Sequence, residues 1–322
     1  MRRPPSAHAG RWISSMSHSD QTSEVRKRLA TGKQRRFRAG ALTIVVARSA
    51  GYCYGVERAL QITTEAPGKY PAPIATLGPL IHNPAVVEQL TEQGVKVVES
   101  VAEASGGTVV VRTHGVAPQT IEDARRRGLT IVDATCPFVT VAQKKAAALS
   151  RAGYVVVILG EHDHPEVAGL MACAGEGVLV VEDAAALDLG ALRDKRVGVV
   201  VQTTQSRERL AALVQALSPL ARETLVYNTI CEATELRQEA AREVASEVDA
   251  VLVVGGRNSA NTRRLAALCR QIQPQTHHVE RAGEIRPEWF GGVGTVGITA
   301  GASTPDAEID AAVEVVRRLA AG

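Results

Sequence analysis

From residue 41 onwards the chain alternates short runs rich in β-branched residues with longer runs of helical periodicity. Strands that alternate with helices of about 10–15 residues are typical of βαβ units, in which right-handed crossovers join parallel strands. The pattern therefore predicts an α/β fold with helices on the faces of parallel sheets. The predicted strands are 41–47, 73–77, 108–113, 129–134, 154–160, 197–202, 225–230, 250–256 and 295–299. The predicted helices are 56–66, 83–93, 118–127, 138–151, 165–172, 206–217, 233–247, 260–271 and 305–319.

Three cysteines lie where a predicted strand ends and a predicted helix begins: Cys53, Cys136 and Cys231. They are 83 and 95 residues apart, whereas zinc ribbons use close CxxC pairs and disulfide scaffolds are short and rich in cysteine. A helix N-terminus favours the thiolate, which is the form that binds metals. Three thiolates leave one position of a four-position cluster open, which indicates an iron–sulfur site. Cys173 and Cys269 lie inside helical runs, so we interpret them as core residues.

Polar side chains also follow nearly all of the remaining predicted strands. Ligands of open α/β sheets bind beyond the carboxyl ends of the strands, which makes this position informative. Taken singly, a loop histidine is usually at the surface, and Ser or Asn before a helix is usually an N-cap. Their recurrence at the same kind of position as the cysteines favours one shared site. The residues are His82, His114, His164, Glu166, Thr203, Thr204, Asn258, Ser259, Asn261 and Ser303.

Two simpler interpretations of the cysteines stay open at this point. The thiols are buried packing residues in one of them, and in the other they form a closed Cys₃His zinc site with His82, His114 or His164. A nicotinamide site is disfavoured, because VLVVGGRNSAN lacks the G-x-G-x-x-G pattern. Its short polar turn before a helix is better suited to phosphate oxygens.

Composition bounds the class of protein. The chain has 322 residues, 45% of them apolar and 22% charged, which predicts a globular protein of about two or three domains. Its five cysteines, an odd number, favour a reducing compartment. The net charge of +3 comes from residues 1–40; the remaining residues carry 27 basic and 32 acidic side chains, which does not indicate a nucleic-acid surface. No apolar run approaches the roughly 18–20 residues of a membrane span.

Nine motifs, in order, make the chain resemble the LytB/IspH family of 4-hydroxy-3-methylbut-2-enyl diphosphate reductases over residues 42–316. They are AGYCYGVERA, IHNPAVVEQL, THGV, VDATCPFVT, HPEVAG, QTT, CEATELRQEA, VVGGRNSAN and TAGAST. The resemblance implies three similar α/β domains in a trefoil-like, pseudo-threefold arrangement around a central iron–sulfur cluster. The expected divisions are a disordered basic tail or over-called start at 1–40, a first strand and Cys53 loop at 41–54 that packs with the last domain, and domains at 55–136, 137–230 and 231–318.

The resemblance also implies the reaction and its partners. The family reduces (E)-4-hydroxy-3-methylbut-2-enyl diphosphate to isopentenyl and dimethylallyl diphosphates, the last step of the non-mevalonate isoprenoid pathway. Its cofactor is a [4Fe–4S] cluster with three Cys ligands and an open fourth iron, and its electron donor is a protein such as reduced ferredoxin or flavodoxin. A cytoplasmic location follows, with organelle import through residues 1–40 as a minor alternative, and neither nucleic acid nor membrane is an expected partner.

Carried onto this sequence, the family pattern assigns a role to each matching residue. Glu166 is the expected proton source. Ala260 replaces a serine of many relatives and keeps only its backbone N–H for the diphosphate, and Gly256 replaces another serine. The expected cluster ligands are Cys53, Cys136 and Cys231. The expected substrate-binding residues are His82, His114, His164, Thr203, Ser259, Ala260, Asn261 and Ser303.

Two other functions are considered beside the reductase. One is a hydro-lyase that uses the open iron only as a Lewis acid, and the other is a zinc-stabilised binding module. A need for an external electron donor separates the reductase from the hydro-lyase, and the bound metal separates both from the zinc module.

Overall fold

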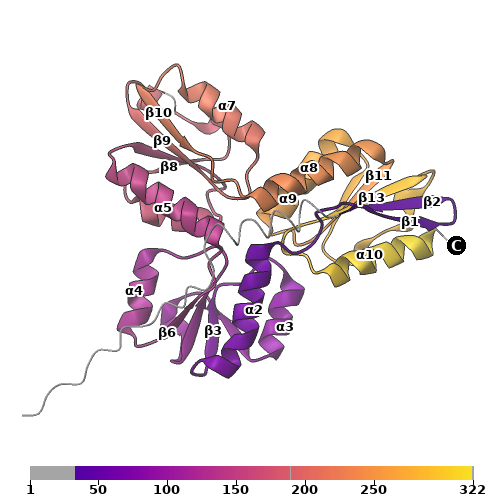
Figure 1. The fold of residues 1–322 in the computed structure, drawn as a ribbon, viewed down its shortest axis with the longest axis horizontal. Coiled ribbons are helices and arrows are strands. Elements are labelled where there is room, and N and C mark those ends of the chain that lie inside the picture. Colours follow the sequence, from indigo (N-terminus) through magenta and orange to yellow (C-terminus); the bar gives the residue numbers. More distant parts are fainter. Residues whose placement is uncertain (1–32, 189, 321–322) are drawn as a thin grey trace, which may run out of the picture.

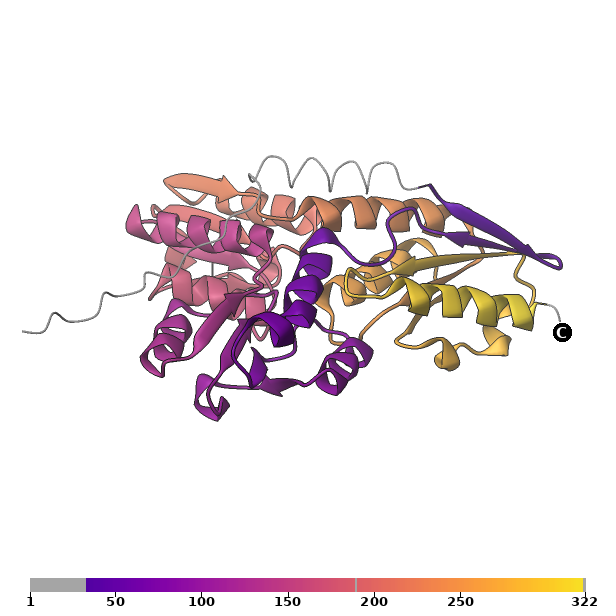
Figure 2. The same cartoon turned by 60° about the horizontal axis from the view of Figure 1, so that its bottom comes forward.

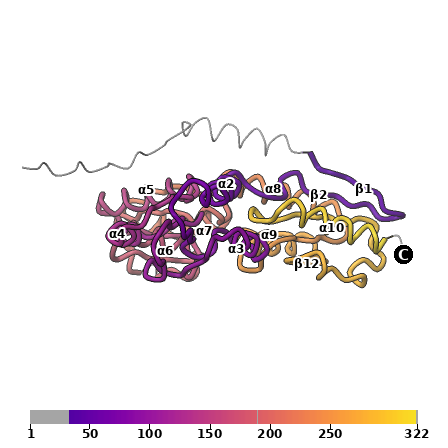
Figure 3. Tube along the Cα trace, turned by 90° about the horizontal axis from the view of Figure 1, so that it is seen from below, coloured from indigo at the N-terminus to yellow at the C-terminus, as the bar shows by residue number. Residues whose placement is uncertain are grey.

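The computed structural model describes residues 33–188 and 190–320. Three α/β lobes extend from a common centre (Figure 1), and the view from below shows them lying in one layer (Figure 3). Each lobe is one sheet with the helices on its two faces. The α/β fold with parallel sheets is therefore as predicted.

The first lobe contains α2 (Tyr54–Lys69), β3 (Ile74–Leu77), α3 (Pro84–Glu92), β4 (Val95–Val98), β5 (Thr108–Val111), α4 (Pro118–Arg126) and β6 (Thr130–Asp133). Its parallel sheet has the order β4-β3-β5-β6. Apolar side chains of α2 and α3 pack on one face, and those of α4 pack on the other.

The second lobe contains α5 (Pro137–Arg151), β7 (Val155–Leu159), α6 (Pro165–Ala174), β8 (Leu179–Val181), β9 (Arg196–Val201), α7 (Arg207–Leu217) and β10 (Glu223–Tyr227). Its parallel sheet has the order β8-β7-β9-β10. Helices α5 and α6 cover one face, and α7 covers the other.

The third lobe combines the two ends of the described chain. It contains β1 (Arg35–Ala39), β2 (Leu42–Val46), α8 (Glu232–Glu247), β11 (Ala250–Val254), α9 (Ala260–Ile272), β12 (Thr276–Val279), β13 (Thr295–Ala300) and α10 (Asp306–Leu319). The sheet order is β12-β11-β13-β2-β1, parallel except for the β1–β2 pair. Helices α8 and α9 cover one face, and α10 covers the other. Figure 2 shows β2 beside the strands of the C-terminal segment.

The three lobes share one plan. In each lobe, one helix comes first in the plan and four parallel strands follow it. Side by side in the sheet, these strands lie in the order second, first, third and fourth. The first two helices of the lobe cover one face of the sheet, and the third covers the other face. In the third lobe the fourth strand is β2, which comes from the opposite end of the chain. Because the strands within each sheet are parallel, their carboxyl ends share one edge, and the loops that follow them meet at the centre of the molecule.

One part of the predicted tail is ordered. Residues 35–39, which the sequence placed in a disordered segment, form the edge strand β1. Gly40 has φ +58°, which allows the tight turn into β2, and Arg36 pairs with Glu247 of α8 at 2.8 Å. This part of the prediction is wrong; residues 1–32 lie outside the described residues. The divisions at 55, 137 and 231 stay predictions.

Within residues 33–188 and 190–320, no helix has both the length and the apolar character that a membrane span requires.

The packing of α8 on the third sheet gives a test of the fold. A methyl group at Gly297 of β13 would overlap Val244 Cγ1 and lie 3.1 Å from Val248 Cγ2. We expect Gly297→Ala to lower the free energy of unfolding by about 1–3 kcal/mol, measured by denaturant titration. The matched control is Gly283→Ala, because a methyl group there meets no described atom within 4 Å. Equal losses in both variants would contradict the packing.

Candidate functional site

A cavity of about 100 Å³ lies where loops of the three lobes meet. Its walls are built from the turns at the carboxyl ends of the strands and from the first residues of the helices that follow. The structure places every residue that the family pattern assigned to the site on this one cavity. These residues are Cys53, His82, His114, Cys136, His164, Glu166, Thr203, Cys231, Ser259, Ala260, Asn261 and Ser303. Of the other polar strand-end residues, Thr204 also lines the cavity and Asn258 does not.

The three cysteines occupy equivalent positions. Cys53, Cys136 and Cys231 are the N-cap residues of α2, α5 and α8, each with extended backbone. Among the described residues none of these side chains caps its own helix and none forms a disulfide. Each therefore follows the fourth strand of one lobe, begins the first helix of the next and lines the cavity.

The surroundings of the thiols fit a shared cationic group. A methyl group at Gly55 would lie 2.6 Å from Cys136 Sγ and 3.9 Å from Cys53 Sγ, so this glycine leaves the two sulfurs their space. Burial, followed by the charge of Cys53, raises the pKa of Cys136, and burial raises that of Cys231 to about 11. The predicted lowering by the helix N-termini is thus outweighed by desolvation. Three soft donors that need a positive charge between them suit an iron–sulfur cluster.

The three histidines form a second group. The ring centroids of His82 and His114 are 4.5 Å apart, and that of His164 lies 5.6 Å from the first and 5.3 Å from the second. Burial lowers the pKa of His82 to about 4 and that of His164 to about 3, and it lowers the pKa of His114 well below its usual value. Uncharged imidazoles at neutral pH can donate an N–H to an anion or coordinate a metal ion.

The N-terminus of α9 faces the cavity with neutral donors. Ser259 is the N-cap and accepts a hydrogen bond from Thr262 N at 3.3 Å, so its hydroxyl proton stays available. Asn261 is 4% exposed, and neither its side-chain nitrogen nor its oxygen has a hydrogen-bond partner among the described residues. Ser303 donates weakly to the carbonyl of His82 at 3.4 Å. A helix N-terminus with unpaired amide and hydroxyl groups is suited to phosphate oxygens.

Gly256 explains one departure from the family pattern. A side chain at this position would place its Cβ 2.5 Å from the carbonyl oxygen of His82. The glycine therefore lets the turn before α9 approach the loop that carries His82.

Glu166 is buried in the first turn of α6 and is 1% exposed. Its two carboxylate oxygens accept hydrogen bonds from Thr203, one from the backbone N at 2.6 Å and one from the hydroxyl at 2.8 Å. Burial raises the pKa of Glu166 to about 7, against the opposing effect of these bonds. The carbonyl of Thr203 in turn accepts from the N–H of Cys231 at 3.0 Å. A carboxyl with a pKa near neutrality beside the thiols is suited to proton transfer.

Three polar lining residues were not predicted. Arg237 is 1% exposed and donates to the carbonyl of Gly51 at 2.7 Å, although its place in the polar run ELRQEA is typical of a solvated helix face. Thr234, in the first turn of α8, lies with its hydroxyl 3.1 Å from Cys231 Sγ. Thr113 also lines the cavity, at the end of the predicted strand 108–113. Its strand-end position and the i, i+3 spacing of Cys231 and Thr234 are sequence signals that could have found two of the three.

A family model described as LytB protein matches residues 44–317. The chain belongs to the LytB family. It is 48% identical over 281 residues to the 4-hydroxy-3-methylbut-2-enyl diphosphate reductase of Geotalea uraniireducens, which covers 86% of this chain and 98% of the relative. The reductase of the same name from Pelobacter propionicus is 49% identical over 278 residues, again 86% and 98%.

Two solved structures are similar to this LytB-family chain. The structure of (E)-4-hydroxy-3-methyl-but-2-enyl diphosphate reductase, described as the terminal enzyme of the non-mevalonate pathway, has a TM-score of 0.63 at 42% identity and covers 85% of this chain and 99% of its own. The E-1-hydroxy-2-methyl-but-2-enyl-4-diphosphate reductase of Plasmodium falciparum has a TM-score of 0.78 at 27% identity, with 84% and 87% covered.

The raised pKa of Glu166 predicts a pH-dependent stability. Its value in the folded chain is about 7, above the ordinary 4.5, so its contribution is present below pH 4.5 and is lost as the pH rises through 7. Relative to Glu166→Gln, the wild-type free energy of unfolding should fall by up to about 3 kcal/mol between pH 5 and pH 8. Denaturant titrations at both pH values, at equal metal loading, measure this.

In Glu166→Gln an amide replaces the carboxylate that accepts the two hydrogen bonds. This change shifts the free energy of unfolding by the same amount at both pH values. The control is Glu88→Gln, because this side chain is 67% exposed and should show no such trend. A difference between wild type and Glu166→Gln that does not change with pH would contradict the raised pKa.

Proposed function

We propose that this chain is a 4-hydroxy-3-methylbut-2-enyl diphosphate reductase that forms isopentenyl and dimethylallyl diphosphates, the last step of the non-mevalonate pathway. Its family membership and its relatives of 48–49% identity support the proposal. In the overall reaction the carbon–oxygen bond of the allylic alcohol breaks, two electrons and two protons are consumed, and the hydroxyl leaves as water.

The single observation that carries the proposal is the division of the central cavity. Three thiols form one group at the N-termini of α2, α5 and α8, and three uncharged imidazoles face the N-terminus of α9 as another. Glu166 is linked to the thiol group through Thr203, and its charge acts on Cys231. Side chains suited to an anionic tail, a leaving hydroxyl and a redox centre therefore line one cavity.

The residues that would hold a [4Fe–4S] cluster are Cys53, Cys136 and Cys231. When bound, such a cluster supplies single electrons and an iron with Lewis-acid character. Because Gly55 has no side chain, it leaves space beside the sulfurs for the cluster. The hydroxyl of Thr234 would be a polar partner beside the cluster.

The diphosphate would be bound by neutral donors: the imidazoles, the hydroxyls of Ser259 and Ser303, the amide of Asn261 and the backbone N–H of Ala260. The unpaired amide of Asn261 gains partners only when an acceptor and a donor enter the cavity. Because the histidines are uncharged without substrate, binding of the anion favours their protonation and takes up protons. The helix N-terminus contributes further attraction.

Glu166 would donate the proton that the leaving hydroxyl requires. Its pKa of about 7 keeps a large fraction protonated at neutral pH. The hydroxyl of Thr203, which now donates to the carboxylate, would orient the carboxyl and the substrate hydroxyl together. Burial of both groups excludes water from the proton path.

A small electron-transfer protein, such as reduced ferredoxin or flavodoxin, would deliver the electrons, and a reducing, cytoplasmic compartment would keep the thiols available.

Loss of one thiol should abolish cluster binding. We expect Cys136→Ala to lose most of the iron and sulfide that anaerobic reconstitution introduces, because one of three ligands is missing. Cys173→Ala is the matched control, since Cys173 is partly exposed on α6 and does not line the cavity. Iron and sulfide analysis measures both variants.

A finding of zinc alone would support a different site. The ring nitrogens of His82, His114 and His164 lie within 4.8 Å of one another and could hold one ion, which favours a zinc-binding module as the second candidate. About four irons per chain in the wild type would exclude it. Turnover without an external electron donor would instead favour a hydro-lyase.

Removal of the proton donor should separate binding from turnover. We expect Glu166→Gln to keep its iron content and its substrate affinity but to lose about 10²–10⁴-fold in kcat, measured anaerobically with a reduced dye as the electron donor. Glu208→Gln, which removes an exposed carboxylate of the second lobe away from the cavity, is the control for kcat. Near-normal kcat in Glu166→Gln would refute the assigned role.

A further inference from the structure

A second cavity of about 350 Å³ adjoins the first, and His82 and His164 line both. Its other walls come from the second lobe on one side and from the third lobe on the other. Acidic and basic side chains face each other across it, so its two sides are not held together by apolar packing. The remaining lining residues are Glu161, Asp163, Pro165, Glu182, Asn258 and Arg263.

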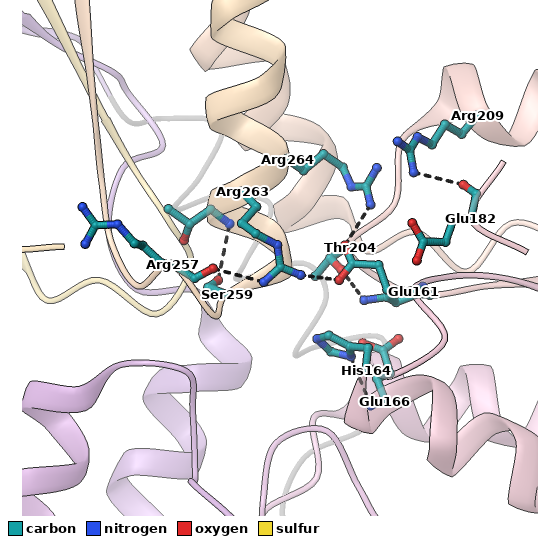
Figure 4. A network of polar contacts seen from close by, with 12 residues as sticks. Glu161, His164, Glu166, Glu182, Thr204, Arg209, Arg257, Ser259, Arg263 and Arg264 are labelled. Atoms are coloured by element: carbon teal, nitrogen blue, oxygen red, sulfur yellow. Dashed lines mark hydrogen bonds and ion pairs between the residues drawn. The ribbon is translucent and has the colours of Figure 1, made fainter. Parts of the chain in front are cut away.

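The side chain of Glu161 bridges the second and third lobes at the edge of this cavity (Figure 4). One of its carboxylate oxygens pairs with Arg263, and the other lies 3.3 Å from Arg264 Nη2. Both arginines belong to the first two turns of α9, whereas Glu161 follows β7. The side chains of Glu161 and Arg264 are only 19% and 11% exposed, so solvent screens this bridge less than a surface ion pair.

Both ends of the bridge are anchored to residues of the candidate anion site. The carbonyl of Glu161 accepts a hydrogen bond from His164 N at 3.0 Å, and its own N–H donates to Gln202 Oε1 at 2.9 Å. On the other side, Arg263 N donates to the carbonyl of Ser259 at 3.0 Å. The route from His164 to Ser259 therefore consists of two backbone hydrogen bonds and one ion pair.

Other ion pairs join the same two lobes at a different place. Arg242 pairs with Glu208 at 2.6 Å, and Arg207 pairs with Glu235 at 2.6 Å, in both cases between α7 and α8. These helices lie beside the segment where the chain passes from the second lobe into the third. The four side chains of these two ion pairs do not line either cavity.

We propose that Glu161, with Arg263 and Arg264, is a positioning clamp that sets the distance between the His164 and Ser259 sides of the diphosphate site. This inference rests on the proposed function, because the diphosphate is the group that both sides must reach at once. The clamp acts on binding geometry and not on the carbon–oxygen bond. Its loss affects KM far more than kcat.

The test uses Glu161→Gln, Arg263→Gln and the double variant in the reconstituted enzyme. Each single variant should raise KM for the allylic diphosphate about fivefold, with kcat within about twofold of the wild type. The double variant should be no worse than Glu161→Gln alone, because that change already removes the Arg263 pairing together with the Arg264 pairing. Glu208→Gln is the matched control: it breaks an ion pair between the same lobes away from the cavities and should leave KM unchanged.

Titration calorimetry with inorganic diphosphate measures binding without turnover. We expect weaker binding in the variants with raised KM and unchanged binding in Glu208→Gln. Tighter binding in Glu161→Gln would overturn the proposal, since it would mean that the carboxylate competes with the ligand for Arg263. An unchanged KM, additive effects or an equal rise in Glu208→Gln would also overturn it. A wild type that binds diphosphate but does not reduce the substrate refutes the proposed function, and the calorimetric comparison still decides the clamp.

Discussion

The structure depends on one constraint: the carboxyl ends of three parallel sheets must face a common centre. Parallel strands give each lobe a single loop edge, and the chain leaves each lobe at that edge through its fourth strand. Cys53, Cys136 and Cys231 occupy these three exits, at the N-cap positions of the helices that follow. The thiols therefore converge because of the topology, without any need for cysteines that are close in the sequence.

Desolvation shifts pKa values at the centre of the molecule in two directions: it lowers those of the histidines and raises that of Glu166. It holds the imidazoles of His82 and His164 uncharged, and it keeps the carboxyl of Glu166 partly protonated near neutral pH. In the proposed reaction an anionic substrate would therefore meet N–H and O–H donors of low charge, and Glu166 would be the proton donor. The permanent charges of Arg263 and Arg264 lie further out, where Glu161 compensates them.

The alternation of strands and helices, the cysteine positions and the polar strand ends could all be read from the sequence, because each follows from a local rule. Burial depends on the tertiary environment. The raised pKa of Cys231 reverses what its helix position predicts, and Arg237 is buried in a helix whose local sequence is polar. Four edge strands were missed: Arg35–Ala39 and Thr276–Val279 carry few apolar residues, whereas Val95–Val98 and Leu179–Val181 are mostly apolar but only four and three residues long. The Glu161 bridge joins residues about a hundred positions apart, which no single-sequence spacing rule can pair.

The strand β2 completes the third sheet from the opposite end of the chain. During synthesis this strand leaves the ribosome early, but its partner β13 is made only at residues 295–300. The segment that carries Cys53 must therefore wait until nearly the whole polypeptide exists before it can reach its final place. Until residues 295–300 are made, a nascent chain therefore holds at most two of the three sulfur positions in order.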